Sequence, residues 1–508
     1  MIEPKVDTDD SAALDRSAIS GSFLVAGLVS AVIIGLVLRI DYIHGHYLWT
    51  DETTTRFYMG LSWEDFARWF RYGRDFHPPL YFAWLRSLLS ISSGLAEIQT
   101  LRYLDLVWLP STIAVLGWIG FRRPRLRAAL IVSSLLVAAG PTFVYLGAEL
   151  RSYGLFLFLA AALTVLAIEG LDSECMTRGR VVLMATVALL LSFTHYTGLL
   201  VVGAITGSAV IAAVIMGRPW RRFVIAGASA FLGFLSHAPA LLNQLHRRES
   251  IYSTSLAEAR EFLLRGFGPI GWGVIVLAIG AAAASLLSRR PNSLHLAESR
   301  LGSSRFRDPG FMVPTLAVAL FMVGVGSVAV ITGVDLLNFG VSIVPSFLLV
   351  LSAGVIAASV FERATVALLL VTATMSITLS FASNQDPSIF EGNRVSTMDI
   401  FSNALFDDPS LRWAFGSGLT IVHVDWDYPN DYFSEQAEQL VPRAQIEALS
   451  IPEYTELANV LERVLTDKPR RILIVTRLPL DTRILPQIPP GVQPQVINEN
   501  LVELTFDP

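Results

Sequence analysis

The sequence predicts an α-helical polytopic membrane protein that ends in a small soluble α/β domain. Of the 508 residues, 53% are apolar and only 16% are charged, and the mean hydropathy is +0.54. Many apolar residues form runs of about 20, the length that crosses the hydrocarbon core of a bilayer. A soluble chain could not keep so much apolar surface in water. The lipid bilayer is therefore the first partner that the sequence predicts.

The N-terminal segment is predicted to be a cytoplasmic tail followed by a membrane anchor. Residues 1–20 are polar and acidic and show no periodicity, which is typical of a short disordered tail. Residues 21–40 form the first apolar run. A cleaved signal peptide is the alternative, but the run is long for such a peptide and no small-x-small cleavage site follows it. We therefore expect residues 21–40 to remain as the first span.

The segment 41–100 carries acidic residues between strongly apolar neighbours, and we expect it to hold the active-site loop. Its apolar part, residues 78–95, is almost long enough to be a second span. However, the next run, residues 101–121, ends in the basic cluster Arg122–Arg127, which the positive-inside rule places in the cytoplasm. A complete crossing by residues 78–95 would put that cluster outside. We therefore expect an external juxtamembrane helix, started by proline at a favoured position.

The remaining apolar runs alternate with arginines and complete a transmembrane domain over residues 21–382. Arg178, Arg218 and Arg289 belong to basic segments that the same rule assigns to the cytoplasm. About 11 spans follow, an odd number that leaves the N-terminus inside and the C-terminus outside. After the first two, the predicted spans are residues 130–146, 152–170, 181–194, 196–216, 223–242, 266–287, 311–331, 341–360 and 365–380.

Residues 383–508 have the composition of a soluble domain, which we expect on the external side. Residues 419–424 and 471–475 indicate buried strands, and residues 495–506 indicate an edge strand. Amphipathic patterns predict helices at 431–441 and 453–467. The segment is short and poor in glycine-rich loops, so a small α/β domain is favoured over a nucleotide-binding enzyme.

The net charge argues against a nucleic-acid-binding protein, and the cysteine content argues against a protein that depends on disulfides. The net charge is −5, and no segment gathers the basic stripe that binding to nucleic-acid phosphates requires. The single cysteine, Cys175, cannot form an intrachain disulfide. We therefore predict no nucleic-acid partner and no dependence on an oxidising compartment.

Two acidic motifs could carry chemistry. Asp51 and Glu52 lie beyond the end of the first span, where the simplest interpretation is a pair of solvated loop carboxylates. The motif Glu149-Leu-Arg151-Ser-Tyr153 occupies another external junction, and the arginine distribution puts both motifs on the same side of the membrane. Carboxylates and an arginine at one interface supply an acid–base pair and a phosphate clamp.

Several other polar residues have both a functional and a structural interpretation. His77 precedes Pro78 and is either a ligand contact or a surface residue at a helix start. His195 and Tyr196 end another span, where an interfacial anchor is the structural alternative. Further candidates are His44 and His46, a weak metal-binding pattern; Arg102 and Asp105, one turn apart and expected to satisfy each other; and the loop residues Arg247 and Arg248, which could hold an anionic head group. No motif defines a cofactor or metal site, and a divalent metal is left as an open alternative.

Taken in order, three of these motifs carry a resemblance to a known family. The acidic pair at Asp51, the sequence His77-Pro-Pro-Leu-Tyr81, and the pattern Tyr145-x-x-x-Glu149-x-Arg151-x-Tyr153 follow one another on a helix-rich membrane chain. This arrangement resembles the GT-C membrane glycosyltransferases of the protein O-mannosyltransferase and aminoarabinose transferase type. The resemblance covers residues 21–380. Each motif is short, and it is their order and common side that make the resemblance specific.

The resemblance implies roles for the matching residues. In that family the donor is a polyprenyl-phosphate sugar, and an aspartate of the first external loop is the base that acts on the acceptor. Asp51 would be this base and Glu52 its neighbour in the acceptor site. The implied substrate-binding residues are His77, Tyr81, Glu149, Arg151, Tyr153, His195 and Tyr196. One departure is that Asn338-Phe339 stands before Val344-Pro345 where many relatives have Arg-Tyr, so Arg247 or Arg248 would have to replace the missing phosphate ligand.

The resemblance therefore implies a glycosyltransferase of the cell membrane that acts at the outer face of the bilayer. It moves a sugar from a polyprenyl-phosphate donor to a lipid, glycan or protein acceptor of the cell envelope. A transporter or lipid flippase without glycosyl transfer is the alternative, for which ionisable residues near the middle of spans and repeated halves are expected. The ionisable residues gather at outer ends instead, which favours the transferase over the transporter.

Overall fold

The structure is a computed structural model, and it divides the chain into two compact units. The first unit comprises Met1–Ile43 and Leu61–Gln385, and the second comprises His44–Gly60 and Asp386–Pro508. The residues that the structure describes are 19–45, 52, 55, 58–59, 61–71, 78–91, 98–172, 176–240, 309–332, 343–344, 347–348, 350–351, 419–425, 445–450, 461, 471–476, 493–498 and 501–505.

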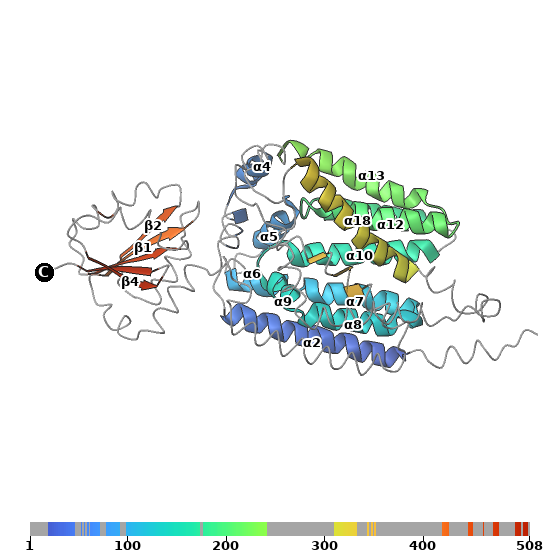
Figure 1. The fold of residues 1–508 in the computed structure, drawn as a ribbon, viewed down its shortest axis with the longest axis horizontal. Coiled ribbons are helices and arrows are strands. Elements are labelled where there is room, and N and C mark those ends of the chain that lie inside the picture. The colour runs from blue at the N-terminus through green and yellow to red at the C-terminus, as the bar shows by residue number, and fades with distance from the viewer. Residues whose placement is uncertain are drawn as a thin grey trace, which may run out of the picture. The chain divides into compact units, whose positions relative to one another are not determined.

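The first unit is a bundle of helices (Figure 1), in agreement with the predicted α-helical membrane domain. Its described helices are α2 (Gly21–Gly45), α4 (Trp63–Arg71), α5 (Leu80–Ile91), α6 (Ile98–Asp105), α7 (Trp108–Arg122), α8 (Arg127–Ala139), α9 (Pro141–Ala148), α10 (Tyr153–Asp172), α11 (Arg178–Ser192), α12 (Gly198–Ile215), α13 (Arg221–Leu235) and α18 (Pro309–Thr332), with a short 3₁₀ turn η2 at Pro124–Leu126.

Four described segments are long and apolar enough to cross a membrane. They are Gly21–His44, Thr100–Arg122, Tyr153–Asp172 and Gly198–Ile215, and a fifth is added if the bent pair α8 and α9 is taken as one span. α2 shows how such a segment meets lipid, because Val29, Ile33 and Val37 are about half exposed along one stripe while Leu24 and Leu28 on the other side are buried. In a bilayer that stripe contacts hydrocarbon rather than water. The structure thus confirms several apolar spans, and the predicted total of about 11 stays a prediction.

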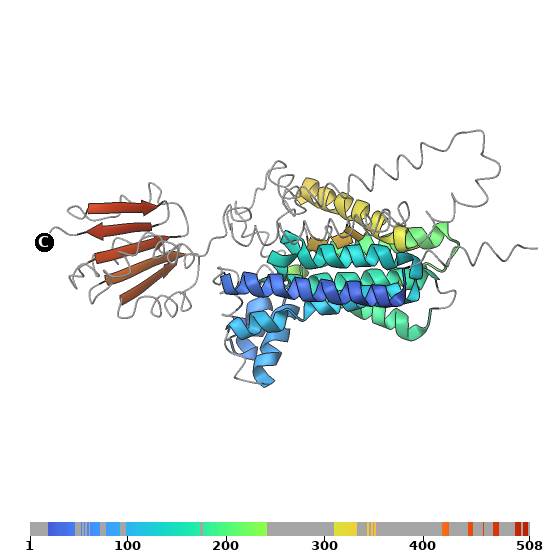
Figure 2. The same ribbon diagram turned by 90° about the horizontal axis from the view of Figure 1, so that it is seen from below.

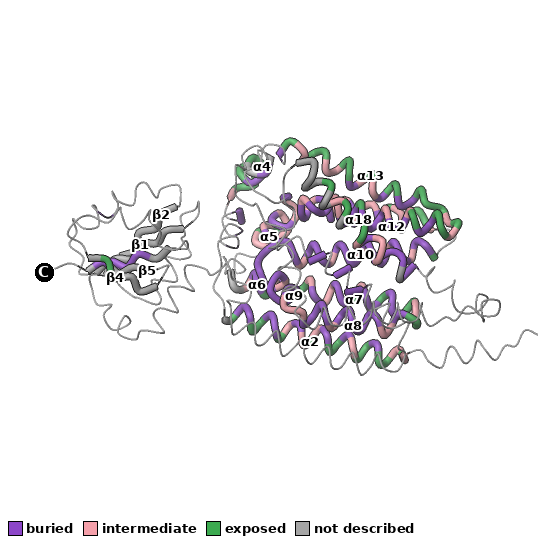
Figure 3. The backbone as a smooth tube through the Cα atoms, in the orientation of Figure 1, coloured by how far each residue is buried: buried purple, intermediate pink, exposed green. Residues whose placement is uncertain are grey.

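α10 occupies the centre of the bundle. It packs against α7 on one side and against α11 and α12 on another, and α12 in turn packs against α13 and α18. Figure 3 shows α10 mostly in the colour of buried residues, whereas α13 carries many exposed ones. The predicted span 152–170 corresponds closely to this helix, Tyr153–Asp172. Its first residue, Tyr153, is buried, whereas its last residue, Asp172, is exposed, so the N-terminal end of α10 is the one held by the core.

Two predicted spans are divided into shorter helices. The run predicted at 101–121 contains a turn at Leu106 and Val107, between α6 and α7. The run predicted at 130–146 is broken at Gly140, where α9 leaves α8 at an angle of 59°. The physical reason is Pro141, which has no N–H for the helix ladder and whose ring clashes with the preceding turn. The run predicted as a span at 130–146 is therefore a bent pair of helices and not one straight helix.

The shorter helices α4, α5, α6 and α9 gather at one end of the bundle (Figure 1), and Figure 2 shows α4 to α6, in the lighter blues, to one side of the long helices. α5 covers Leu80–Ile91 and is too short to cross the membrane, as expected for the predicted juxtamembrane helix. The carbonyl of Pro79 accepts the hydrogen bond from the Ala83 N–H, so Pro79 stands just before the first helical residue. This end of the bundle carries the candidate site.

The described strands of the second unit form one five-stranded sheet in the order β2-β1-β3-β5-β4. β1 is parallel to both β2 and β3, whereas β5 is antiparallel to β3 and β4. Parallel neighbours need long crossover connections, and the helices predicted at 431–441 and 453–467 fall in these connections. Apart from the buried helical Leu461, both lie outside the described residues. The strands are β1 (Leu419–Asp425), β2 (Gln445–Ser450), β3 (Arg471–Thr476), β4 (Gln493–Asn498) and β5 (Leu501–Thr505).

The strands predicted at 419–424 and 471–475 are confirmed as β1 and β3, but the single edge strand at 495–506 is wrong. That segment is an antiparallel pair, in which β5 lies between β3 and β4. β4 is therefore the edge strand, and it contains the exposed Pro494. Proline has no N–H for a sheet ladder and is tolerated where the strand faces solvent. β2 is not among the predicted strands, because its sequence Gln-Ile-Glu-Ala-Leu-Ser mixes polar and apolar residues without a strong strand preference.

Candidate functional site

The turn between α9 and α10 brings buried charges to the end of the bundle. Glu149 is fully buried and Arg151 is 3% exposed, and the Arg151 N–H donates to the Glu149 carbonyl at 2.8 Å. The turn exists because α9 ends at Ala148 and the backbone of Glu149 is extended. Charged groups are seldom buried unless polar partners compensate the lost hydration. A buried carboxylate and guanidinium two residues apart therefore mark this turn as a candidate site.

A second turn, between α11 and α12, places His195 beside the start of α10. The imidazole lies against Phe156, with ring centroids 5.3 Å apart, and near Tyr153, with centroids 6.3 Å apart. Nδ1 accepts from the Thr197 backbone N–H at 3.2 Å and lies 2.8 Å from the Thr197 hydroxyl. Because a backbone N–H can only donate, Nδ1 is an acceptor and the neutral ring carries its proton on Nε2. His195 thus presents Nε2–H as a donor on the side away from Thr197.

The start of α5 is hydrogen-bonded to the second of these turns, the one between α11 and α12. The N–H of Leu80 donates to the carbonyl of Phe193 at 3.2 Å, which ties the Pro-Pro-Leu-Tyr motif to the end of α11. Pro78 is buried and Tyr81 is fully buried. The structure therefore brings together three motifs that are far apart in sequence: the segment Pro78–Tyr81, the turn Glu149–Tyr153 and the turn His195–Thr197. Tyr196 is half-buried in the last of these.

Tyr81 has a protein partner that the sequence does not reveal. Its hydroxyl donates to Oδ2 of Asp105 at 3.0 Å, and the indole N–H of Trp108 donates to Oδ1 of the same carboxylate at 2.8 Å. Asp105 is 3% exposed and Arg102, one turn earlier, is 1% exposed. From the sequence, Arg102 is the only partner predicted for Asp105, because the two residues lie one turn apart. Its position inside an apolar run is the signal that could have found it, because an ionisable residue within a span is a candidate for function.

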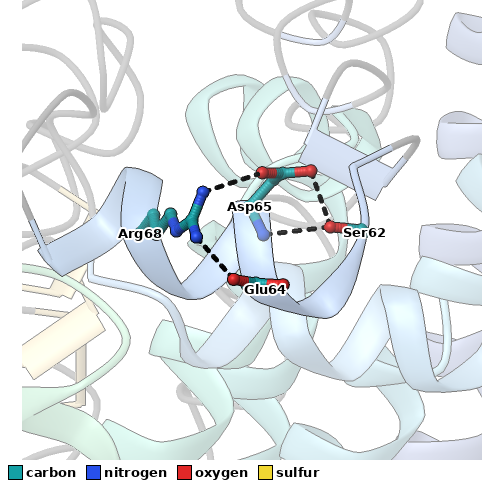
Figure 4. Close-up of polar contacts among 4 residues, drawn as sticks. All are labelled: Ser62, Glu64, Asp65 and Arg68. Atoms are coloured by element: carbon teal, nitrogen blue, oxygen red, sulfur yellow. Dashed lines mark hydrogen bonds and ion pairs between the residues drawn. The ribbon is translucent and has the colours of Figure 1, made fainter.

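The acidic residues of α4, Glu64 and Asp65, are engaged in local contacts within their own helix and are not catalytic candidates. Ser62 caps the helix by accepting from the Asp65 N–H at 3.0 Å and donating to the Asp65 carboxylate at 2.6 Å, and Arg68 contacts Glu64 at 2.5 Å (Figure 4). The side chains of Arg68 and Glu64 are 64% and 74% exposed. Exposed pairs of this kind contribute little to stability and are freely hydrated. Glu64 is therefore a suitable control for substitutions in the same loop.

Glu52 is fully buried and belongs to the second unit by its contacts. The interpretation of Asp51 and Glu52 as two solvated carboxylates is therefore wrong for Glu52. Four other predicted site residues, Asp51, His77, Arg247 and Arg248, lie outside the described residues. Among the residues that are described, no group of three or more His, Cys, Asp or Glu is placed to hold a metal ion.

The helices and the polar turns together define a membrane protein with several apolar spans and a buried charged site at one end of its bundle. The solved structure of ArnT from Cupriavidus metallidurans in the apo state is similar to it over 95% of this chain and 97% of that chain, with a TM-score of 0.50 and 12% identity. At this identity the likeness is one of fold. It confirms the resemblance in fold to the aminoarabinose transferase type of GT-C membrane protein.

Two other solved structures match with lower TM-scores. ArnT from Cupriavidus metallidurans bound to undecaprenyl phosphate has a TM-score of 0.42 and 13% identity, with 96% of this chain and 98% of that chain covered. The oligosaccharyltransferase AglB from Archaeoglobus fulgidus, in complex with an inhibitory peptide and a dolichol-phosphate, has a TM-score of 0.40 and 12% identity, with 89% and 69% covered. No protein-family model matches the chain, and no curated protein is significantly similar in sequence.

Proposed function

We propose that this protein is a glycosyltransferase that moves a sugar from a polyprenyl-phosphate donor to a cell-envelope acceptor at the outer face of the membrane. The observation that carries the proposal is the convergence of three buried polar motifs at one end of an ArnT-like bundle. A donor with a polyprenyl chain suits a site at that position, because the chain can stay in hydrocarbon while the phosphate and sugar meet polar groups.

The direction of the helices supports an external site. α10 begins at Tyr153 beside the candidate site and ends at Asp172, which forms an ion pair with Arg123. A helix of this length rises about 30 Å, the thickness of the hydrocarbon core. The Arg122–Arg127 cluster therefore lies at the opposite end of the bundle from the site. If the cluster is cytoplasmic, as the positive-inside rule predicts, the site faces the other side.

The described residues can neutralise and orient a phosphate. Arg151 offers a planar fork of donors that matches two phosphate oxygens. The rings of His195 and Tyr153 lie near each other at the start of α10, and the Nε2–H of His195 is a donor. Stabilising the charge that develops on a leaving phosphate is the largest contribution expected in such a site. Glu149 is assigned to the same donor region because it adjoins Arg151.

Asp51 is proposed as the general base, with Glu52 in the acceptor site. The acceptor hydroxyl attacks the anomeric carbon with inversion, the bond between that carbon and the phosphate oxygen breaks, and the phosphate leaves with the bonding electrons. The hydroxyl proton passes to the Asp51 carboxylate. A positioned base contributes on the order of 10² to 10⁴ in rate. Lipid, glycan and protein acceptors are all compatible with this step.

The transporter or flippase alternative has one observation in its favour. α8 and α9 form a broken helix pair with a 59° bend, and broken helices that point toward a substrate are common in transporters. The two functions differ in product, because a flippase returns the lipid-linked sugar unchanged on the other side of the bilayer. Only a transferase yields a sugar bonded to a new acceptor and a free polyprenyl phosphate.

The test is sugar transfer from radiolabelled polyprenyl-phosphate sugars to membrane fractions by the purified, reconstituted protein. The parent protein is expected to transfer label and Asp51→Asn to lose on the order of 10² to 10⁴ in rate, with a smaller loss for Glu52→Gln. Glu64→Gln, an exposed carboxylate of the same loop, is the matched control and should match the parent. Equal rates for the parent and Asp51→Asn would remove Asp51 as the base, and translocation without any transfer would favour the flippase.

A further inference from the structure

Arg39 is a charged residue held entirely inside the membrane bundle. It lies near the end of α2 and is 2% exposed. Its Nη1 donates to the carbonyls of Gly35 at 3.0 Å and Ala138 at 2.9 Å, and its Nη2 donates to those of Val137 at 3.2 Å and Phe143 at 2.7 Å. Within the described part of the chain its hydrogen-bond partners are thus backbone oxygens. Burying a charged side chain inside a membrane bundle has a high free-energy cost, so a structural or functional reason for it is expected.

The reason lies in the break between α8 and α9. In an unbroken helix the carbonyl of Val137 would accept from the N–H of residue 141, but that residue is Pro141 and has no N–H. Arg39 supplies a donor to this carbonyl and to the next one, that of Ala138. The guanidinium also sits at the C-terminal end of α8, where the helix dipole favours a positive charge. Arg39 therefore takes over the hydrogen bonding that the proline removes from the ladder.

Arg39 also contacts α9 at two levels. It donates to the carbonyl of Phe143 in the first turn of α9, and it lies against Gly147 in the last turn. A Cβ added at Gly147 would be 2.8 Å from Nε and 3.1 Å from Nη2 of Arg39. The glycine thus leaves the room that the guanidinium fills. Arg39 thus contacts α9 in both its first and its last turn.

The approach of α2 to α8 depends on a second glycine. A Cβ added at Gly35 would be 2.6 Å from Cδ2 of Leu109 and 3.1 Å from the Cα of Ala138. Because Gly35 lies one turn before Arg39, the close backbone contact delivers the guanidinium to the end of α8. The sequence therefore provides three coordinated features, namely Gly35, Arg39 and Gly147, around the break at Pro141.

We propose that Arg39 is a positioning residue that sets the direction of α9 and thereby places Glu149 and Arg151 for the lipid-phosphate donor. α9 ends at Ala148, directly before Glu149, so a change in its direction moves both charged side chains. The role of those side chains rests on the proposed function, whereas the hold of Arg39 on the break does not. Arg39 itself touches neither reacting atoms nor donor in this proposal.

A purely stabilising role for Arg39 makes different predictions from a positioning role. In both cases Arg39→Met weakens the protein. Adding Pro141→Ala to that variant restores an N–H that can bind the Val137 carbonyl and so recovers stability, but it also allows α8 and α9 to straighten. If Arg39 positions α9, stability recovers in the double variant and activity does not. If Arg39 only satisfies carbonyls, the direction of α9 does not depend on it, and transfer per folded molecule stays at the parent rate in Arg39→Met.

The experiment compares Arg39→Met, Arg39→Lys and the double variant Arg39→Met with Pro141→Ala against the parent. Arg127→Met is the matched control, because Arg127 also donates to two backbone carbonyls, those of Gly120 and Ile19, but at the other end of α8. We expect sugar transfer to fall on the order of 10²-fold in Arg39→Met and in the double variant, the usual result of misplacing a catalytic group by about 1 Å. Arg39→Lys is expected to recover only part, since a point charge cannot reach carbonyls on both helices. Arg127→Met should transfer at the parent rate.

A second measurement is independent of catalysis. Hydrogen exchange of the amides in residues 142–152 should quicken in Arg39→Met by roughly 10- to 100-fold, the effect expected from losing one hydrogen bond to a charged group, and should not change in Arg127→Met. Gly147→Ala, which crowds the guanidinium, should lower transfer, whereas Gly203→Ala, whose added Cβ meets nothing within 4 Å, should not. Unchanged exchange in Arg39→Met, or recovery of transfer in the double variant, overturns the inference. A parent protein that transfers no sugar refutes the proposed function alone and leaves the exchange result to decide the role of Arg39.

Discussion

The hydroxyl of Tyr81 offers a test of whether this residue binds substrate or supports the site from behind. In the structure it donates to the buried carboxylate of Asp105 at 3.0 Å. Tyr81→Phe removes this donor and leaves the ring in place. A hydrogen bond to a charged group contributes about 1.5 to 3 kcal/mol. The indole of Trp108 still binds the other carboxylate oxygen, so we expect a loss within that range rather than above it.

The measurement is reversible unfolding of the purified protein in mixed detergent micelles, together with the KM for the lipid-linked donor. A loss of about 1.5 to 3 kcal/mol corresponds to roughly a 10- to 100-fold change in the ratio of folded to unfolded protein. If Tyr81 is a supporting residue, this ratio falls and KM stays close to the parent value. A raised KM with unchanged stability in Tyr81→Phe would refute the supporting role and return Tyr81 to the substrate-binding residues.

Two further predictions concern the charge at the site and the sidedness of the chain. Arg151→Lys should lose much of the transfer activity and Arg151→Ala nearly all of it, because an ammonium cannot replace a bidentate fork; unchanged donor affinity in Arg151→Ala would remove Arg151 from the phosphate site. In a Cys175→Ser background, cysteines introduced at Arg125, which is exposed, and at Ser434 should react with impermeant reagents from opposite sides of the membrane. Labelling of both from the same side would contradict the predicted topology.

Composition and arginine distribution are sufficient to predict where most described helices lie. α2 begins at Gly21 and α10 at Tyr153, within a residue of the predicted starts, because long apolar runs bounded by polar residues have only one stable structure in a bilayer. β1 and β3 are predictable for a related reason, since short runs of β-branched residues bounded by polar segments favour buried strands. The hairpin of β4 and β5 is predicted as a single strand, because the sequence patterns of its two strands follow each other almost without a break.

The break at Pro141 and the role of Arg39 are not predictable by the same means. An apolar run keeps its hydropathy whether the helix is straight or broken, and a membrane helix tolerates proline wherever a neighbour supplies the missing donor. Here the donor comes from a residue about 100 positions earlier in the chain, so no local pattern reveals it. The bond from Tyr81 to Asp105 is hidden similarly, because these two residues lie on separate helices, α5 and α6, that only the folded bundle brings together.

The arginine distribution predicts a common side of the membrane for the three motifs, and the structure adds how they are brought together. The bond from Leu80 to Phe193 and the ring contact between Tyr153 and His195 connect segments that are far apart in sequence. Sidedness can be inferred from arginines, but adjacency within one side depends on how helices pack. For this reason the pairing of Tyr81 with Asp105 rather than with a ligand could not have been anticipated.

Pro494 in β4 has a consequence for how the sheet of the second unit meets other chains. An open edge strand displays a row of unpaired donors and acceptors onto which another strand can add. Proline has no N–H and a fixed φ, and it is tolerated in an edge strand where its nitrogen faces solvent. With Pro494 so placed, an added strand would lose a rung of its ladder at this point. The edge is thus protected against β-strand addition between molecules, a safeguard of value for proteins crowded together in the plane of a membrane.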